Sequence, residues 1–248
     1  MNMEPIEINF MGDSAIIIRL SNTVNLEVHL KIQAICNYFE SNPFKGMIEC
    51  VPSVVTVTVY YNPIEVLKNI KASDKGNPFQ VVKNIVLDVL HNIRYEKEEL
   101  SRIVEMPVCY GGVFGPDLDF VARFNKLSIE EVIEIHCNYD NRVYMIGFAP
   151  GFPYLYGMSE RIAAPRKETP SISVPQGSVG IAGSQTGIYP ISTPGGWQVI
   201  GRTPIRLFRP EDEVPSLIRS GDIIRFKRID EKEYYKIKKL EEENEKCV

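Results

Sequence analysis

The sequence predicts an α+β protein with two parts, an N-terminal layer of strands and helices followed by a compact β structure rich in turns. Three observations lead to this fold class. About the first 95 residues contain short strands followed by amphipathic helices. A charged run with few apolar residues follows at Tyr95–Glu99. The stretch Tyr144–Pro210 then holds 10 of the 17 glycines and 9 of the 17 prolines, residue types that exclude long helices.

The N-terminal part is predicted from local patterns of hydrophobic residues. Gly12-Asp13 is a turn signal between two strands. Apolar residues at helical spacing begin at Val28 and predict a helix with one buried face. Alternation in Val54–Tyr61 predicts a strand with one buried face. In chain order we expect strands or helices at Ile6–Phe10, Ala15–Leu20, Val24–Glu40, Met47–Val51, Val54–Tyr61, Pro63–Lys71 and Pro78–Ile93.

The second part is expected to open with a strand at Arg102–Cys109 and to close with one at Ile223–Ile229. Between them, Ser128 and Glu131 form a capping box that starts a helix. His136 lies in the last turn of that helix, where a cation stabilises the helix dipole. The Lys- and Glu-rich tail is expected to be a frayed helix or disordered. We therefore expect domains at residues 1–95 and 96–230 and a charged tail at 231–248.

Composition and charge narrow the classes of function. The net charge of −4 gives no reason to expect nucleic acid, and no apolar run approaches the roughly 20 residues of a membrane span. The 5 cysteines include no CxxC and no signal peptide precedes them, so we expect reduced thiols in a cytoplasmic protein. The segment from Arg142 to Arg209 differs, because it carries 7 Lys or Arg and only 2 acids. This excess suits a carboxylate or phosphate ligand, or else it is a set of solvated arginines at strand edges.

Several catalytic motifs are absent from the sequence. GxxxxGK[ST] does not occur, so we expect no P-loop, and without HExxH the 3 histidines do not predict a metal site. Gly183–Gly187 resembles a nucleophile elbow only loosely, because its central residue is Gln185. We therefore do not expect a self-contained hydrolase triad.

The Gly- and Pro-rich stretch instead offers loops with a constrained backbone. Gly147–Tyr154 holds aromatic rings that lose little entropy on binding. Gly177–Gly187 offers backbone amides and polar side chains, and Ser192–Trp197 leads into the single tryptophan. Together these loops predict an apolar groove with a few converging donors, the usual form of a small-molecule site. The alternative is a β-barrel whose loops are only tightly packed.

The second half also contains three longer motifs, PVCYGGVFGPDL, RVYMIGFAPGFPYL and PQGSVGIAGSQTGIYPISTPGGWQVIGRTPIRLF. In this order they closely resemble the allophanate-hydrolase subunit 1 family, which includes the B subunits of 5-oxoprolinases and the sporulation-kinase inhibitor KipI. The dense match covers about Pro107–Pro210, and the first hundred residues fit the family only in layout. The motifs are highly specific to the family and less specific to one member's activity.

The resemblance implies a fold, partners and a reaction. The fold would be a ferredoxin-like α/β sandwich followed by a cyclophilin-like, carboxyltransferase-type β-barrel. The chain would be the B subunit of a 5-oxoprolinase, which uses ATP to open 5-oxoproline to glutamate together with a carboxyltransferase-like C subunit, and with an A subunit. ATP would be used by the complex, because this chain has no P-loop. The alternative is a KipI-like inhibitor that binds a sporulation histidine kinase and blocks its autophosphorylation. Peptidyl-prolyl isomerase activity rests on fold analogy alone.

The same resemblance, together with the charge of the segment, suggests roles for particular residues. Amide activation by phosphorylation creates negative charge, which arginines and oriented amides stabilise. We expect substrate or phosphate to contact Arg166, Arg202, Gln185 and Thr186. We expect the groove to be lined by Phe148, Pro150, Phe152, Tyr189 and Trp197, with His136 and Arg142 as further candidates. No nucleophile or general base stands out, so we expect the chemistry to be completed at an interface with another subunit.

Overall fold

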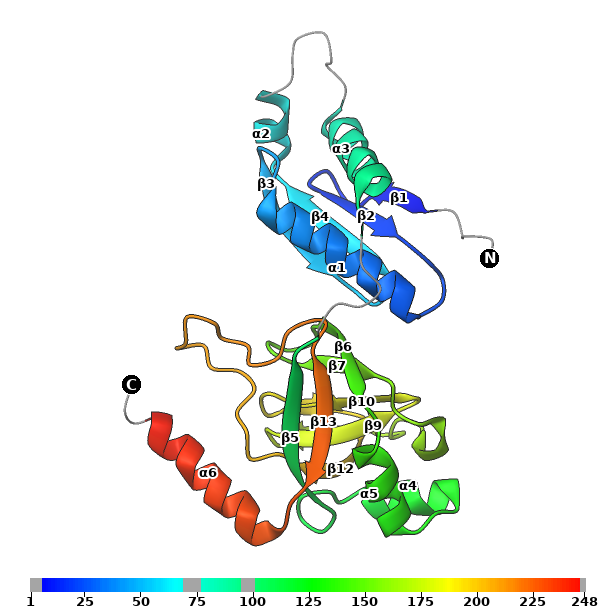
Figure 1. The fold of residues 1–248 in the computed structure, drawn as a ribbon, viewed down its shortest axis with the longest axis vertical. Helices are drawn as coiled ribbons and strands as arrows, with labels where there is room; N and C mark the ends of the chain where they lie inside the picture. Colours follow the sequence, from blue (N-terminus) through cyan, green and yellow to red (C-terminus); the bar gives the residue numbers. More distant parts are fainter. Residues whose placement is uncertain (1–5, 69–76, 95–100, 246–248) are drawn as a thin grey trace. The chain divides into compact units, whose positions relative to one another are not determined.

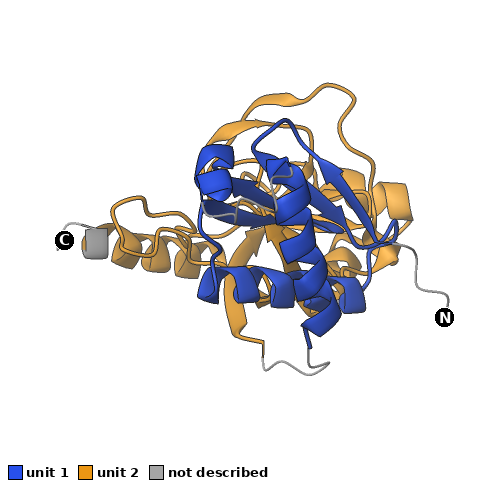
Figure 2. Cartoon of the chain, turned by 90° about the horizontal axis from the view of Figure 1, so that it is seen from above, with its two compact units in different colours: residues 1–100 blue, residues 101–248 orange. Residues whose placement is uncertain are grey.

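A computed structural model describes residues 6–68, 77–94 and 101–245 of the 248-residue chain. The chain divides into two compact units, residues 1–100 and residues 101–248 (Figures 1 and 2). In the described ranges, no helix is both long and apolar enough to span a bilayer.

Unit 1 is one antiparallel sheet with helices packed on it. The strands β1 (Glu7–Phe10), β2 (Ala15–Arg19), β3 (Met47–Pro52) and β4 (Thr56–Tyr61) lie in the order β1-β2-β4-β3. The helices are α1 (Leu26–Ser41), α2 (Pro63–Lys68) and α3 (Pro78–Asn92), and α1 and α3 cover the same face of the sheet (Figure 1). The last residues of the predicted helix Pro63–Lys71 lie outside the described residues.

Local sequence signals explain where the helices of unit 1 begin and which faces they bury. The side chain of Asn25 accepts a hydrogen bond from the backbone N–H of Val28 (2.9 Å), and Asn77 caps α3 in the same way. In β4, residues alternate between buried and half-buried, as the sequence predicts. The core joins alternate residues of β2 and β4 to one side of each helix, including Ile16, Ile18, Val57, Val59, Ile32, Ile35, Phe39, Val82 and Val86.

The connectivity of unit 1 does not confirm the expected ferredoxin-like fold. A ferredoxin-like chain follows the order β-α-β-β-α-β. Unit 1 follows β1-β2-α1-β3-β4-α2-α3, with a hairpin before the first helix and two helices at the end of the unit's described part. The coarser prediction of strands covered by packed helices is confirmed, and the specific fold is not.

Unit 2 contains a closed barrel of seven strands. They are β5 (Ile103–Tyr110), β6 (Asn141–Ile146), β7 (Pro153–Tyr156), β9 (Ser178–Ala182), β10 (Gln185–Ile188), β12 (Gln198–Arg202) and β13 (Ile223–Arg228). They close in the order β10-β7-β6-β13-β5-β12-β9, and only β5 and β13 pair in parallel. A separate ribbon joins β8 (Ser171–Val174) to β11 (Thr193–Gly195). The predicted barrel is confirmed, while its likeness to cyclophilins stays a prediction.

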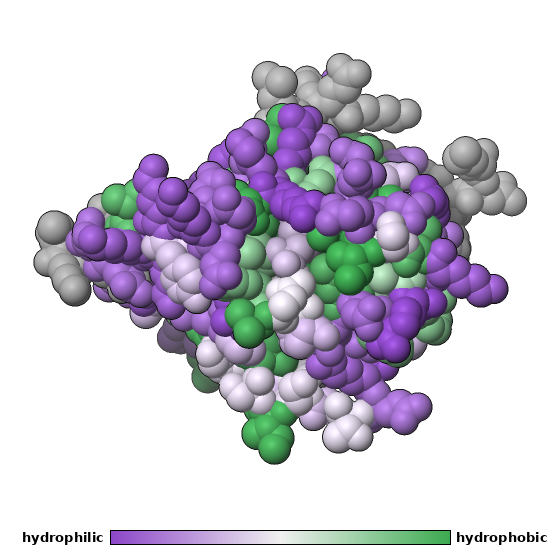
Figure 3. Space-filling view, turned by 90° about the horizontal axis from the view of Figure 1, so that it is seen from below, coloured by the Kyte–Doolittle hydropathy of each residue, from purple (hydrophilic) through white to green (hydrophobic). Residues whose placement is uncertain are grey.

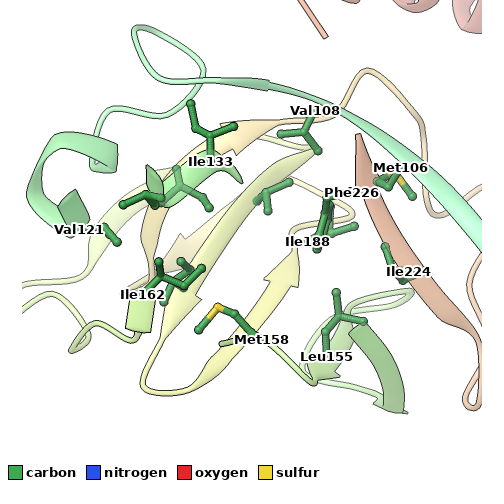
Figure 4. Close-up of a cluster of buried hydrophobic side chains, with 14 of the residues drawn as sticks. Met106, Val108, Val121, Ile133, Leu155, Met158, Ile162, Ile188, Ile224 and Phe226 are labelled. Carbon is green, nitrogen blue, oxygen red and sulfur yellow. The ribbon is translucent and has the colours of Figure 1, made fainter. Parts of the chain in front are cut away.

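The interior of the barrel is filled with side chains. Met106, Leu155, Ile188, Ile224 and Phe226 are labelled among the residues of this core in Figure 4, and each is at most 3% exposed. The helices α4 (Leu118–Asn125) and α5 (Ile129–Cys137) add buried residues of their own to the same cluster. The barrel is therefore a packed core, and ligands are expected at its outer surface or loops.

The capping box that starts α5 is confirmed. The Ser128 hydroxyl accepts from the Glu131 backbone N–H (3.2 Å), and the Glu131 carboxylate accepts from the Ser128 backbone N–H (2.7 Å).

The charged tail forms a helix, α6 (Glu231–Glu245), which packs on unit 2. Tyr234 is only 5% exposed, and its ring centroid lies 4.6 Å from that of Phe114. Farther along the helix, the Glu241 carboxylate accepts a hydrogen bond from Arg209 (2.6 Å). An aromatic contact and an ion pair therefore hold α6, although its composition is mostly Lys and Glu.

Candidate functional site

The loop between β6 and β7 presents an exposed aromatic ring on an unusual backbone. Phe148 is 63% exposed and has a φ of 69°, in the left-handed region. Local hydrogen bonds hold this conformation, since the N–H of Gly147 donates to the carbonyl of Phe152 (3.1 Å) and the N–H of Phe152 to that of Ala149 (3.0 Å). A bulky residue at positive φ is costly and tends to occur at functional sites. The loop is therefore the first candidate for ligand contact.

Beneath Phe148 lies a compact cluster of aromatic rings centred on Phe152. The ring centroid of Phe152 lies 5.4 Å from that of Phe148, 5.3 Å from Tyr189 and 5.5 Å from Trp197, all edge to face. Tyr154 is 4.9 Å away and half-buried. Phe152, Tyr189 and Trp197 are at most 6% exposed, so they form a packed base rather than the walls of an open groove. Phe148 is the exposed ring of the cluster.

Two glycines allow the chain to pass close to these rings. A Cβ atom on Gly195 would lie 2.4 Å from the Tyr189 hydroxyl. A Cβ atom on Gly187 would lie 3.0 Å from both Phe152 and Trp197. Part of the glycine content of this stretch therefore serves close packing around the aromatic cluster.

We expect Phe148→Gly to raise the free energy of unfolding of unit 2 relative to Phe148→Ala by about 1 kcal/mol, because glycine adopts positive φ without the steric cost of a Cβ. Both variants remove the same exposed ring, so their difference isolates the backbone. Urea unfolding followed by the fluorescence of Trp197, the single tryptophan, reports on unit 2. Equal stability of the two variants would show that the loop holds no strain.

A cation lies beside the aromatic cluster. Arg166 is exposed. Burial raises the pKa of Tyr189, and the backbone N–H of Trp197 and the charge of Arg166 act in the opposite direction. The guanidinium of Arg166 is therefore within electrostatic reach of the Tyr189 hydroxyl. An aromatic surface with an adjacent arginine suits a flat ligand that carries a carboxylate.

Gln185 lies beside a second group of aromatic residues, which consists of Tyr156 and Tyr144. Burial raises the pKa of Tyr156, and a hydrogen bond from the Gln185 side chain opposes this shift. The ring of Tyr156 also lies 4.5 Å from that of Tyr144. From the sequence, Tyr154 is placed in the aromatic loop but not among the site residues, and Tyr156 is missed. The alternation in PYLY of β7 places both on the same face of the strand.

Thr186 and His136 lie in the core of unit 2, where they bind each other. They are 0% and 1% exposed. The Thr186 hydroxyl donates to the carbonyl of Gly180 (3.1 Å), so it accepts from Nε2 of His136 (3.0 Å). Nδ1 of His136 then accepts from the Tyr110 hydroxyl (2.8 Å). Neither side chain reaches the surface, so neither is placed to contact a ligand bound there.

The charge state of His136 differs from the sequence expectation. Burial lowers its pKa from 6.5 to about 3, so the ring is neutral at pH 7. The predicted role as a cation at the C-terminus of α5 is therefore wrong. Its ring instead stacks on Phe226 at 4.2 Å and joins α5 to the barrel.

The two remaining predicted arginines lie elsewhere. Arg142 donates from Nη1 to the Ser101 hydroxyl (2.7 Å) and to the carbonyl of Gly221 (3.2 Å). Arg202 ends β12, the strand that Trp197 precedes, and lines a cleft of about 530 Å³ between the barrel and α6. There burial raises the pKa of Tyr234, and the positive charge of Arg202 acts in the opposite direction. The structure therefore gathers Phe148, Phe152, Tyr189 and Trp197 in one cluster, with Pro150 on the loop of Phe148 and Arg166 within electrostatic reach of Tyr189. The contacts of Arg142 and Arg202 are with other residues.

Among the described residues, no group of three or more His, Cys, Asp or Glu could hold a metal ion. A larger cleft, of about 710 Å³, lies in unit 1 between α1 and α3. Its lining includes Asn37, Tyr38, Asp88 and Asn92 and contains none of the predicted site residues. The candidate site is therefore the exposed ring of Phe148 over the aromatic cluster, together with the exposed residues Pro150, on the same loop, and Arg166, within electrostatic reach of Tyr189.

The chain is a carboxyltransferase-type protein. The chain matches the family described as carboxyltransferase domain, subdomain C and D, over residues 6–218, and it belongs to that family. It is 54% identical to the B subunit of the 5-oxoprolinase of Bacillus subtilis, over 94% of this chain and 96% of that protein. It is 36% identical to the B subunit of the 5-oxoprolinase of Escherichia coli O157:H7, over 87% of this chain and 93% of that protein.

Two solved structures have a similar fold. The crystal structure of TTHA0988 matches with a TM-score of 0.73 and 31% identity, over 88% of this chain but only 40% of that longer one. The Kluyveromyces lactis urea amidolyase matches with a TM-score of 0.76 over 96% of this chain and 16% of that chain. At 18% identity, the similarity to the urea amidolyase is evidence for the fold alone.

Proposed function

We propose that this chain is the B subunit of a 5-oxoprolinase, which opens the ring of 5-oxoproline to glutamate at the expense of ATP. The observation that carries the proposal is 54% identity to a protein of that name over nearly the full length of both chains. The Escherichia coli relative and one from Haemophilus influenzae, 35% identical over 91% of this chain, carry the same name. We place the protein in the cytoplasm.

The geometry of the candidate site supports this substrate class. 5-Oxoproline is a small flat lactam with one carboxylate. The lactam would lie against Phe148 and Pro150, and the carboxylate would pair with the exposed guanidinium of Arg166. Gln185 would contribute an amide at the edge of the site, while Phe152, Tyr189 and Trp197 support Phe148 from below. In this proposal His136 and Thr186 position the surrounding elements, and Arg142 and Arg202 are not ligand contacts.

The proposal requires partner subunits. We infer two of them, a carboxyltransferase-like C subunit, and an A subunit, with ATP bound outside this chain. The longer chain of TTHA0988 supports this inference, because a fold like this one occupies only part of that polypeptide. Exposed apolar residues of unit 2 also favour a partner, since Val113 is 75% and Ile172 91% exposed. Figure 3 shows hydrophobic side chains reaching one face of the molecule in several areas among hydrophilic ones.

The chain reconstituted with both partner subunits is expected to release glutamate from 5-oxoproline with hydrolysis of ATP, and omission of this chain is expected to abolish turnover. Arg166→Ala should lower turnover at limiting 5-oxoproline roughly tenfold to a hundredfold, the usual worth of a hydrogen bond to a charged group. Arg161→Ala is the matched control, since Arg161 is also exposed in unit 2 but was not placed at the site. Glutamate release and ATP hydrolysis are followed by coupled assays for glutamate and ADP.

The outcomes test the proposed function and the proposed site separately. If the complete set releases no glutamate, the function is wrong. If it does, but Arg166→Ala behaves like Arg161→Ala, the function stands and the site is wrong. Slower autophosphorylation of a histidine kinase by the isolated chain, without glutamate release by the complex, would instead support the inhibitor alternative.

A further inference from the structure

Two cysteine thiols from different elements of unit 1 lie in contact. Cys36 is on α1 and Cys50 on β3, and their Sγ atoms are 3.5 Å apart. Both are free thiols. A disulfide needs an Sγ–Sγ distance of about 2.0 Å, so a modest movement of the two side chains would bond them.

The surroundings of the two thiols are different. Cys36 is 6% exposed and lies on the buried side of α1, in the same core cluster as Ile32, Ile35 and Phe39. Cys50 is half-buried on β3, where it pairs with Val59 of β4. β3 is at the edge of the sheet, so one side of the strand is not covered by another strand. An oxidant from solvent therefore reaches Cys50 more readily than Cys36.

We propose that Cys36 and Cys50 form a reversible redox pair that a hydroperoxide converts into a disulfide between α1 and β3. This inference is independent of the proposed function, because it concerns only unit 1. It assigns a modification site to a part of the chain that contains none of the predicted site residues.

The reaction takes place in two balanced steps. The Cys50 thiolate attacks an oxygen of hydrogen peroxide and forms a sulfenic acid, and the departing hydroxide takes up a proton to become water. The Cys36 sulfur then attacks the Cys50 sulfur, the S–S bond forms, and the sulfenic oxygen leaves with two protons as a second water. In sum, two thiols and one hydrogen peroxide give one disulfide and two waters. A dithiol reductant restores both thiols by exchange.

The electrostatics of the pair agree with these roles. The neighbouring Cys50 thiol, burial and the carboxylate of Glu40 all raise the pKa of the Cys36 thiol. Cys36 therefore remains protonated at neutral pH and is a poor first nucleophile. Its position against Cys50 makes it the resolving thiol, which needs proximity more than exposure.

The disulfide would tie two elements that are close in sequence and already packed together. It would close a loop of about 15 residues, which restricts the unfolded chain more than the folded one. The thermal midpoint of unit 1 is expected to rise on the order of 10 °C in the oxidised protein. This rise should disappear when dithiothreitol reduces the bond.

The test uses the full chain with Cys247, which lies outside the described residues, replaced by Ser in every protein. After treatment with hydrogen peroxide, mass spectrometry should show a loss of two hydrogen atoms, and peptide mapping should join the peptides of Cys36 and Cys50. Calorimetry should show the raised midpoint. Cys109 and Cys137 of unit 2 serve as internal references and should remain reduced.

Two variants test the separate roles of the thiols. In Cys36→Ala, peroxide should leave Cys50 as a sulfenic acid that dimedone traps. In Cys50→Ala, Cys36 should remain unmodified under the same treatment. The proposal is overturned if the two-hydrogen loss does not occur in the parent protein, if the bond joins any other cysteine, or if Cys36 is the thiol that dimedone labels. The loss of two hydrogen atoms and the identity of the bonded cysteines are both measured on the parent protein. These two outcomes therefore do not depend on whether the variants fold.

Discussion

Gly115→Ala is expected to destabilise unit 2 by about 3 kcal/mol, the upper range for an added methyl group in a packed position. A Cβ atom on Gly115 would lie 1.9 Å from the carbonyl oxygen of Ile200 and 2.7 Å from the backbone nitrogen of Gly201. Both are backbone atoms of β12, so no rotation of a side chain can relieve the overlap. The loop before α4 would have to move away from the barrel.

Hydrogen bonds of the same loop would be lost with that movement. The N–H of Gly111 donates to the Ile200 carbonyl (3.1 Å), and the N–H of Asp117 donates to the Val199 carbonyl (2.9 Å). The Asp117 carboxylate in turn accepts from the N–H of Val199 (2.8 Å). Because these bonds lie on both sides of Gly115, the loop cannot shift at that residue alone.

Gly196→Ala is the matched control for this substitution. The nearest atom to a Cβ on Gly196 would be 3.7 Å away, an ordinary contact, and its φ is outside the left-handed region. Its stability should stay within about 0.5 kcal/mol of the parent protein. Urea unfolding followed by Trp197 fluorescence measures both variants in unit 2. Similar midpoints for the two alanine variants would contradict the close packing of the loop on β12.

Much of the secondary structure could be predicted because its signals are local. The alternation in β4, the capping box of α5 and the helix starts at Asn25 and Asn77 each depend on residues a few positions apart. The closure of the barrel could not be predicted in this way. β5 pairs in parallel with β13, more than 100 residues later, and the residues alone did not predict this pairing.

The candidate site could likewise be predicted only where it depends on residues that are close in the sequence. Phe148 and Phe152 share one loop, so their proximity could be predicted from the sequence. Gln185 and Thr186 were assigned to the same ligand, although neighbouring residues of a strand point to opposite faces. In the barrel Gln185 is half-buried on the outside and Thr186 is fully buried. Without knowledge of which face was the interior, the sequence could not separate them.

His136 could have been assigned to the core by its spacing. It follows Val132 by four residues and Ile133 by three, and both are buried on α5. Its partners could not be predicted, because Thr186 is 50 residues away and Tyr110 is 26. A histidine held neutral by such contacts has a measurable consequence for stability.

Lowering the pH from 7 to 5 is expected to reduce the free energy of unfolding of unit 2 by about 2 kcal/mol through His136. The pKa of His136 is about 3 in the folded protein against an ordinary value of 6.5. Between these values the unfolded chain binds a proton that the folded chain does not. The stabilising contribution is therefore complete above pH 6.5 and is lost progressively as the pH falls toward 3.

His136→Gln should remove this pH dependence. Its side-chain amide can still donate toward the Thr186 hydroxyl, but it does not titrate in this range. The variant is expected to be less stable than the parent protein at pH 7 and to lose little further stability at pH 5. His91→Gln is the control, since His91 is an exposed residue of α3 in unit 1. Urea unfolding curves at both pH values, read from Trp197 fluorescence, give the comparison. If His136→Gln keeps the full loss of stability between pH 7 and 5, then the folded protein binds a proton at His136 as readily as the unfolded chain, and the ring is not held neutral by burial between Tyr110 and Thr186.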